Sequence, residues 1–228
     1  MQQTKDQIYD QIYQEAIQKG WQAWGGNERL KTAKDWLAQL LSYSEIPNTG
    51  KALELGCGEG NLCRLLAKQG YEITGMDVSQ VAIDWAKRKS KVNGINEIVF
   101  LQKDLSATNA LQNEAGQFDV VADGNCLHCI IGEDRKVFFQ NVHNALKTEG
   151  VFFISSLCSK GGVTEYIDRE NQIYRHIPSP KALKQELEEA GFQVVKTTVF
   201  TRTKYNHICI HALKQEMNRG ENEERNIS

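Results

Sequence analysis

The chain has 228 residues, and 27 basic against 29 acidic side chains leave a net charge of −2. This length allows one large domain, or one domain with additions, and the balanced charge argues against nucleic acid or an anionic membrane surface as a partner. No apolar run approaches the roughly 18 residues of a membrane-spanning helix, the first residues lack a signal peptide's apolar core, and six cysteines do not make a disulfide scaffold, so we expect a cytoplasmic protein with reduced thiols.

The first part of the chain is predicted to be helical. Apolar residues recur at helical spacing between Ile8 and Ala16 and again between Leu30 and Leu41. A glycine-rich loop with two tryptophans, residues 20–26, separates the two patterns. We expect these helices either to cover apolar surface of a sheet or to act as a lid over a ligand site.

From residue 51, short apolar segments alternate with helical patterns. The apolar segments are predicted to be strands at residues 52–55, 71–76, 98–101, 118–122 and 151–155. They are apolar throughout rather than alternating, which is typical of a parallel sheet covered on both faces. Right-handed crossovers between such strands predict a doubly wound α/β domain.

The pattern changes after the fifth strand. Residues 158–178 are predicted to be an irregular polar stretch, followed by a helix at 180–190. Two strands at 192–200 and 208–213 are joined by a short turn without a helix, which predicts an antiparallel pair. The tail from 214 to 228 is polar and predicted to be disordered.

Residues 53–61 form the most informative stretch, with glycines at 56, 58 and 60 after an acidic Glu54. Glycine has no Cβ and tolerates positive φ, so a ligand can lie against this backbone. A dinucleotide fingerprint would need glycine at 61, where Asn61 stands instead. The pattern resembles motif I of the class I S-adenosylmethionine-dependent methyltransferases, E/D-x-G-x-G-x-G.

The resemblance extends over residues 28–213 and implies the fold of that family. This fold is a doubly wound, mainly parallel seven-stranded sheet with an antiparallel C-terminal strand. We therefore divide the chain into an N-terminal helical cover at 1–27, a cofactor-binding domain at 28–213 and a polar tail at 214–228.

The resemblance also implies which residues bind S-adenosylmethionine. The family places the acidic residue of motif I near the methionine part of the cofactor, although a capping carboxylate remains an alternative for it. The implied cofactor-binding residues are Glu54, Gly56, Cys57, Gly58, Gly60, Asn61, Asp77, Val78, Ser79, Asp104, Leu105, Asp123 and His128.

Two of the acidic residues follow predicted strands. Asp77 stands about 20 residues after the first loop glycine, where a carboxylate accepts from ribose hydroxyls. Val78 can then pack on the adenine, while Ser79 is also placed to cap the next helix. The family uses a residue at the position of Asp104 for the adenine amine and the backbone N–H of Leu105 for the ring. The alternatives are a carboxylate at a helix N-terminus for Asp77 and an acidic turn residue for Asp104.

The segment from 118 to 129 resembles the fourth-strand region of small-molecule methyltransferases, often F-D-x-V followed by L-H-H. Here the second histidine is replaced by Cys129. The resemblance implies that the Asp123 carbonyl accepts from the cofactor amino group and that His128 lies near the sulfonium and the acceptor. His128, and more weakly Asp123, are the candidate catalytic bases. The alternative for His128 is a partly buried histidine that holds the loop by a hydrogen bond.

Metal and thiol chemistry are the remaining possibilities for the cysteines and histidines. Cys126 and Cys129 form a C-x-x-C pair, but a structural zinc needs about four ligands and no second pair exists. His207, Cys209 and His211 share one face of the last strand by their spacing. We expect cysteines that act as small core or pocket residues and no metal site.

The sequence thus predicts an enzyme that transfers a methyl group from S-adenosylmethionine to a small molecule, by in-line attack of an O, N or S nucleophile. The [DN]-P-P-[YF] and Pro-Cys segments of nucleic-acid methyltransferases are missing after strand four. Acceptor contacts are expected from Tyr9, Tyr13, Trp21 and Trp24, or from the stretch after strand five, with Glu165, Tyr166, Arg169, Tyr174, Arg175 and His176. The alternatives are a catalytically inactive cofactor-binding regulator and a nicotinamide enzyme, which the glycine spacing disfavours. The acceptor and the oligomeric state are not predicted.

Overall fold

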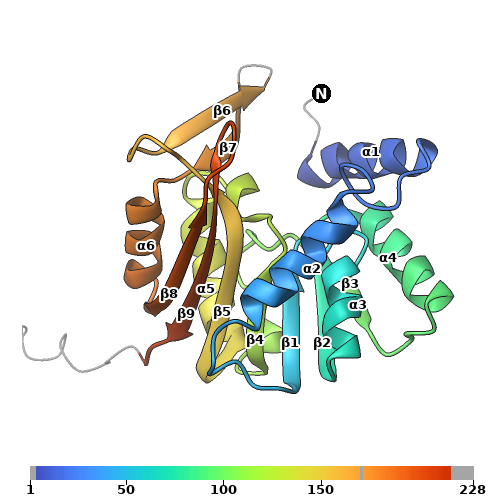
Figure 1. The fold of residues 1–228 in the computed structure, drawn as a ribbon, viewed down its shortest axis with the longest axis horizontal. Coiled ribbons are helices and arrows are strands. Elements are labelled where there is room, and N and C mark those ends of the chain that lie inside the picture. The colour runs from blue at the N-terminus through green and yellow to red at the C-terminus, as the bar shows by residue number, and fades with distance from the viewer. Residues whose placement is uncertain (1–3, 170–171, 217–228) are drawn as a thin grey trace, which may run out of the picture.

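The computed structural model describes residues 4–169 and 172–216, and its centre is a seven-stranded sheet of order β3-β2-β1-β4-β5-β9-β8 (Figure 1). Its strands are β1 Gly50–Leu55, β2 Tyr71–Asp77, β3 Val99–Gln102, β4 Phe118–Asp123, β5 Leu146–Cys158, β8 Phe192–Phe200 and β9 Asn206–Lys214. The helices are α1 Lys5–Gln18, α2 Arg29–Leu40, α3 Asn61–Lys68, α4 Gln80–Val92, α5 Asp134–Ala145 and α6 Pro180–Glu189, with short 3₁₀ turns η1 Gln112–Glu114 and η2 Leu127–Cys129.

The strand pairing confirms the predicted fold class. β3, β2, β1, β4 and β5 are parallel neighbours, while β9 is antiparallel to both β5 and β8. The order reverses at β1, because β2 lies on one side of it and β4 on the other. In doubly wound sheets the carboxyl ends of the strands at such a switch point form the ligand crevice.

Each face of the sheet has its own apolar core. One core contains Leu40 of α2, Leu66 of α3 and Ile83 of α4, and the other contains Phe138 of α5 and Leu187 of α6. These five side chains are at most 1% exposed, and burying each stabilises the fold by about 1.5–3 kcal/mol. Helices on both faces explain why the strands are apolar throughout rather than alternating.

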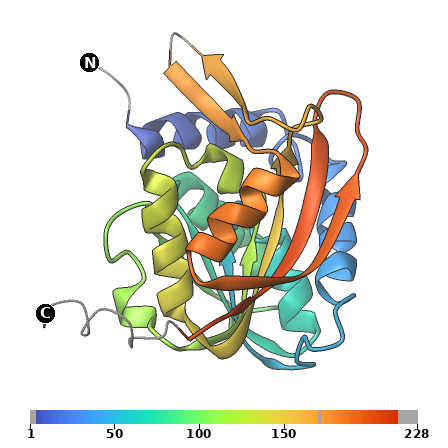
Figure 2. The same ribbon diagram turned by 90° about the vertical axis from the view of Figure 1, so that its left-hand side faces the viewer.

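Helix α1 lies beyond the carboxyl ends of the parallel strands and packs on α4 (Figures 1 and 2). Tyr13 and Ala16 contact the buried Trp85 side of α4 in one small cluster. Asp10 joins the same two helices, since its Oδ1 accepts from the Ser79 hydroxyl at 2.6 Å and from the Val81 amide at 3.1 Å. The first helix is therefore anchored at the N-terminus of α4.

The predicted irregular stretch at 158–178 is wrong. It contains a two-stranded antiparallel sheet of β6 Glu165–Arg169 and β7 Gln172–Ile177, which extends beyond the main sheet (Figure 2). The strand pattern was hidden because β7 buries the polar side chains Arg175 and His176. A second difference concerns β5, which is longer than the predicted 151–155 because its first residue pairs with β4 and its last residues pair with β9.

The predicted polar tail begins too early. Lys214 is the last residue of β9, and the amide of Gln215 donates to the Gly191 carbonyl at 2.9 Å. The remainder of that prediction, residues 217–228, lies outside the described residues. Within the described ranges, no helix combines the length and the apolar character needed to cross a membrane.

Replacing Ser79 by alanine is expected to cost more stability than replacing Ser179. Each serine caps a helix by accepting from the amide three residues on at 3.1 Å, and losing such a cap costs about 1 kcal/mol. Ser79 also donates to Asp10, so Ser79→Ala should cost about 1 kcal/mol more than its matched control Ser179→Ala. Urea unfolding followed by circular dichroism measures both, and equal midpoints would contradict the anchoring role of Asp10.

Candidate active site

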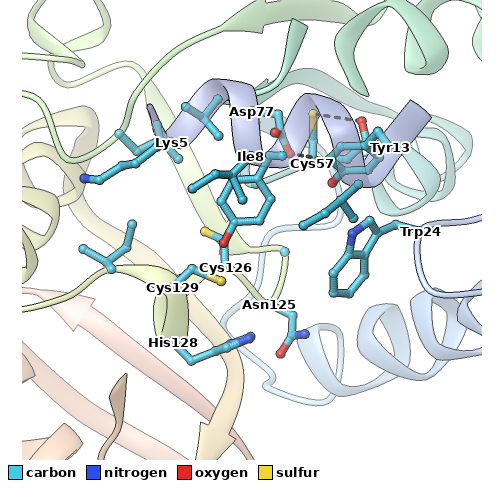
Figure 3. Close-up of a pocket in the computed structure, with 18 of the residues that line it drawn as sticks. Lys5, Ile8, Tyr13, Trp24, Cys57, Asp77, Asn125, Cys126, His128 and Cys129 are labelled. Atoms are coloured by element: carbon cyan, nitrogen blue, oxygen red, sulfur yellow. Dashed lines mark hydrogen bonds between the residues drawn. The ribbon is translucent and has the colours of Figure 1, made fainter. Parts of the chain in front are cut away.

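A cavity of about 1050 Å³ lies at the carboxyl ends of β1, β2 and β4, beneath α1 (Figure 3). Its volume is at the upper end of the roughly 300–1,000 Å³ typical of small-molecule sites. Its wall comes from α1, the loop before α2, the glycine loop, the segment after β4 and β7. The cavity is therefore large enough for a bound molecule and a second reactant.

The glycine loop after β1 turns tightly at the floor of this cavity. Gly56, Gly58 and Gly60 all have positive φ, at 65°, 53° and 72°. A Cβ on Gly56 would lie 2.4 Å from the Cβ of Cys126, and one on Gly60 would lie 2.8 Å from Phe100 Cζ. Conformation and space therefore both demand glycine here, which leaves bare backbone facing the cavity.

Glu54 ends up buried behind this loop, although it also lines the cavity. Its Oε2 accepts from the amide and from the thiol of Cys63, both at 2.8 Å, which ties the end of β1 to the first turn of α3. Burial raises the pKa of Glu54 to about 8, against the opposing effect of those two hydrogen bonds. The capping alternative is thus present in the structure, and the predicted contact with a cofactor stays a prediction.

Asp77 holds the glycine loop in place from the end of β2. Its two carboxylate oxygens accept from the amides of Gly58 and Ser79, each at 2.9 Å. Burial raises the pKa of Asp77 to about 6, and the two amide hydrogen bonds oppose that rise. Asp77 and Val78 line the cavity, whereas Ser79 does not, because its hydroxyl caps α4 and binds Asp10.

The residues after β3 form another part of the wall. Asp104 and Leu105 both line the cavity, and Asp104 Oδ1 accepts from the amide and hydroxyl of Ser106 at 2.9 and 2.6 Å. Lys5 of α1 donates to the same hydroxyl at 2.8 Å and to Asp134 at 2.6 Å. The turn alternative for Asp104 is therefore also observed, beside its place at the cavity.

Asp123 lies under the segment that follows β4, outside the set of cavity-lining residues. It is fully buried, and its Oδ1 accepts from the amides of Cys126 at 2.7 Å and Leu127 at 3.1 Å. Burial raises its pKa to about 6. The side chain shapes the loop, so its position gives no support to the predicted role as a base.

His128 faces the cavity from η2, close to Asn125 (Figure 3). It is 4% exposed, and within the described chain its Nδ1 has no hydrogen-bond partner. Burial first, and then the positive charges of Arg175 and Arg29, hold the pKa of His128 well below its usual range. The imidazole is therefore neutral at pH 7, and it does not fasten the loop through Nδ1.

Three thiols, Cys57, Cys126 and Cys129, also line the cavity. Burial raises the pKa of Cys57 to about 11 and raises that of Cys129, so both are thiols at neutral pH. Among residues 4–169 and 172–216, no group of three or more His, Cys, Asp or Glu side chains is arranged to hold a metal ion. The two histidines of β9 are tied elsewhere, since His207 bonds to Ser155 at 2.8 Å and His211 to the Leu40 carbonyl at 2.9 Å.

Helix α1 contributes to the same cavity as the glycine loop. A Cβ on Gly58 would lie 2.9 Å from the Tyr13 hydroxyl, and burial and then Asp77 raise the pKa of Tyr13 well above its usual range. Ile8, Tyr9 and Ile12 line the cavity from the same helix. The N-terminal segment therefore both packs on α4 and covers the site, so the boundary predicted at residue 27 runs through one cavity wall.

The sequence did not predict a cluster of Trp24, Arg29 and Trp36, which lies next to the glycine loop. The Arg29 guanidinium lies 4.9 Å from the Trp24 ring centroid and 6.0 Å from that of Trp36. Within the described chain, no hydrogen bond or ion pair joins the Arg29 guanidinium to another residue, and Trp24 Nε1 is buried without a partner. No motif marks an arginine at the first position of a helix, so only the fold reveals it.

The residues after strand five that were expected near an acceptor are distributed unevenly. Tyr174 lines the cavity, and Arg175 and His176 are buried behind it. Tyr166 is 53% exposed. The side chain of Arg169 lies outside the described part of the chain.

Comparison with known proteins identifies this architecture. A family model described as a methyltransferase domain matches residues 26–197. The putative methyltransferase YqeM of Bacillus subtilis (strain 168) is 27% identical over 146 residues, which are 63% of this chain and 50% of that protein. The chain thus spans half the length of this curated relative.

Two solved structures share the fold over almost the whole chain. The 1,6-didemethyltoxoflavin-N1-methyltransferase of Burkholderia thailandensis, with 1,6-didemethyltoxoflavin and S-adenosylhomocysteine bound, has a TM-score of 0.70 at 19% identity, covering 95% of this chain and 93% of its own. The [4+2]-cyclase SpnF has a TM-score of 0.72 at 16% identity, covering 94% and 98%. At these identities the similarity establishes the fold.

Glu54→Gln is expected to change how stability depends on pH. The folded-state pKa of Glu54 is raised from 4.5 to about 8, so the folded protein holds this proton more tightly and its contribution to stability falls as pH rises through that range. The variant should therefore gain stability relative to the wild type between pH 5 and pH 8. Urea unfolding at several pH values measures the difference, and a pH-independent difference would contradict the raised pKa.

Proposed function

The chain belongs to the class I S-adenosylmethionine-dependent methyltransferase family, and on that premise we propose that it methylates a small molecule. The observation that carries the proposal is the single cavity that joins the glycine loop, Asp77, Asp104 and His128 beneath α1. Residues from four separate segments converge there, and each segment leaves the carboxyl end of a parallel strand.

The residues present fit the cofactor that this family uses. The wall carries buried polar atoms that lack partners within the described chain, namely Trp24 Nε1, Asn125 Oδ1 and His128 Nδ1. Buried polar groups in proteins are almost always hydrogen-bonded, so such orphans indicate a missing polar ligand. We assign the ribose to Asp77, the adenine to Val78, Asp104 and Leu105, and the remaining length of the cofactor to the backbone of the glycine loop.

Arg29 is the residue we assign to the cofactor's carboxylate. Burial lowers the pKa of Arg29, while the nearby Glu59 and Tyr13 oppose that change, so the guanidinium lies close to the end of the glycine loop. Glu59 is already engaged, because it accepts from the Trp24 amide at 3.2 Å and from the Asn61 amide group at 2.6 Å. A half-buried guanidinium with its donors unused suits a bidentate carboxylate ligand.

Methyl transfer requires the protein mainly to align the acceptor with the methyl group. S-adenosylmethionine supplies an activated methyl group when bound, so the protein's task is to orient the acceptor in line with it and to exclude water. Ile8, Tyr9 and Ile12 of α1 close the cavity from above. His128, which is neutral, can accept a proton from an acceptor, although its lowered pKa makes it a weak base.

A small acceptor is supported by the cover over the site. Helix α1 lies over the cavity, and Ile173 and Tyr174 of β7 line its wall. The net charge of −2 gives no electrostatic attraction to a nucleic acid. The structural relative from Burkholderia thailandensis, a 1,6-didemethyltoxoflavin-N1-methyltransferase, has 1,6-didemethyltoxoflavin bound.

The rival function is cofactor binding without methyl transfer. The similarity to the [4+2]-cyclase SpnF supports this alternative, because a protein described by a different activity has the same fold. Formation of S-adenosylhomocysteine when the protein is incubated with S-adenosylmethionine and a metabolite panel distinguishes the two. The proposed enzyme forms it with at least one acceptor, and a binding protein forms it with none.

Asp77→Ala should weaken the binding of S-adenosylhomocysteine more than His128→Ala does. We expect Asp77→Ala to raise the dissociation constant at least tenfold, because hydrogen bonds to a charged group contribute about 1.5–3 kcal/mol each and the glycine loop loses its Gly58 support. Isothermal titration calorimetry measures the three proteins, with Asp84→Ala, an exposed carboxylate of α4, as control. An unchanged affinity in Asp77→Ala would refute the ribose assignment.

A further inference from the structure

Behind the wall of the cavity lies a buried cation that no carboxylate of the described chain neutralises. Arg175 of β7 is 7% exposed, and it donates to the Tyr9 hydroxyl at 3.3 Å and to the carbonyl and hydroxyl of Tyr174 at 2.9 and 2.6 Å. Within the described residues, no acid forms an ion pair with it. A buried guanidinium with only neutral partners leaves a positive potential in surroundings of low dielectric constant.

Tyr9 lines the cavity and is hydrogen-bonded to Arg175. Its oxygen accepts from Arg175 at 3.3 Å, which leaves its own proton for another acceptor. The nearby Tyr9 hydroxyl lowers the pKa of the Cys129 thiol, although burial raises that pKa overall. Burial raises the pKa of Tyr9 far above its usual range, so the hydroxyl stays protonated. Tyr9 is therefore a hydrogen-bond donor at this wall and not a base.

The groups around His128 act in the same direction. After burial, the positive charges of Arg175, Arg29 and Arg135 lower its pKa, whereas burial lowers the pKa of His207 to about 4 and leaves that imidazole neutral at pH 7. Arg135 is paired with Glu186 at 2.6 Å, and Arg29 is assigned above to the cofactor carboxylate. The positive charge that remains near His128 is that of Arg175 on β7.

Acidic groups oppose this charge only in part. Asp123 and Asp77 raise the pKa of the Cys129 thiol, whereas Arg175 lowers it. Asp134, another acid of the cavity wall, is paired with Lys5 at 2.6 Å. Burial keeps Cys129 protonated, so Arg175 and the Tyr9 hydroxyl offset part of the cost of placing a negative charge at this wall.

We propose that the methyl acceptor binds here as an anion, with its ionised nucleophilic atom facing Tyr9 and His128 and with Arg175 as the countercharge. This inference rests on the proposed methyltransferase function. It specifies the acceptor as a small acid whose reacting O, N or S atom ionises near neutral pH, such as an acidic phenol, a thiol or an acidic heteroaromatic N–H.

The transfer step then balances without a base. The electron pair of the anion forms the new bond to the methyl carbon, the bond between that carbon and the cofactor sulfur breaks, and its electron pair stays on sulfur. The acceptor becomes neutral, and no proton has to leave. This agrees with the weak basicity of His128, which would be poorly suited to deprotonate a neutral alcohol or amide.

The test uses 4-nitrophenol as the probe, because its phenolate absorbs visible light and directly reports ionisation. The wild-type protein saturated with S-adenosylhomocysteine is titrated with the probe between pH 5 and pH 9, and the ionisation midpoint of the bound probe is read from its absorbance. We expect this midpoint to lie at least about one pH unit below that of the free probe, which is a tenfold preference for the anion.

Two variants and a control locate the cause. Arg175→Gln should return the bound midpoint to within about 0.3 units of the free value, and Tyr9→Phe should shift it partway, since it removes the donor but keeps the ring. Tyr9→Phe also keeps the test informative if Arg175→Gln does not fold. Arg88→Gln, which removes an exposed arginine of α4, should leave the lowered midpoint unchanged.

A bound midpoint equal to or above the free value overturns the inference, and so does the absence of saturable probe binding. A lowered midpoint that persists in both Arg175→Gln and Tyr9→Phe overturns the assigned countercharge. Calorimetry with S-adenosylhomocysteine tests the methyltransferase proposal separately from the anionic acceptor. If the wild type does not bind it, the methyltransferase proposal falls with the inference, whereas binding with an unshifted probe overturns the anionic acceptor alone.

Discussion

The close approach of the carboxyl ends of β1 and β4 is the constraint on which the site depends. The amide of Gly124 donates to the Leu55 carbonyl at 2.7 Å, and a Cβ on Gly124 would lie 2.7 Å from the carbonyl oxygen of Gly56. A Cβ on Gly56 would in turn collide with Cys126. Two loops can leave adjacent parallel strands this close together only because glycine occupies both positions. That contact sets the glycine loop opposite the segment that carries His128.

Buried carboxylates hold the loops that this approach brings together. Glu54 accepts from an amide in the first turn of α3, Asp77 from an amide of the glycine loop, and Asp123 from amides of the segment after β4. Burial raises the pKa of all three carboxylates. Hydrogen bonds from amides offset part of the free-energy cost of burying a carboxylate. The same hydrogen bonds hold the backbone in one conformation. The same carboxylates thus serve the fold and prepare the site, so structural and functional roles for Glu54 and Asp77 are compatible rather than exclusive.

The cover of the cavity comes from two segments outside the doubly wound sheet. Helix α1 precedes the sheet and β7 follows five of its strands, yet Arg175 and Tyr9 are hydrogen-bonded across 166 residues of sequence. The cofactor elements lie on the sheet side and the donors for the proposed anion lie on the cover side. In this arrangement the sheet serves cofactor binding, and the cover serves water exclusion and the choice of acceptor.

The sequence by itself determined those features that depend on neighbours along the chain. Apolar runs alternating with helical patterns specified the doubly wound sheet, glycines at every second position specified the loop, and Ser79 specified a helix cap, because each acts over a few residues. The tertiary structure alone decided the β6–β7 hairpin, the position of α1 over the glycine loop, and the places of Arg29 and Arg175. From the sequence, charged side chains on a helix or strand are predicted to face solvent. Only long-range contacts show which of them are buried in the fold.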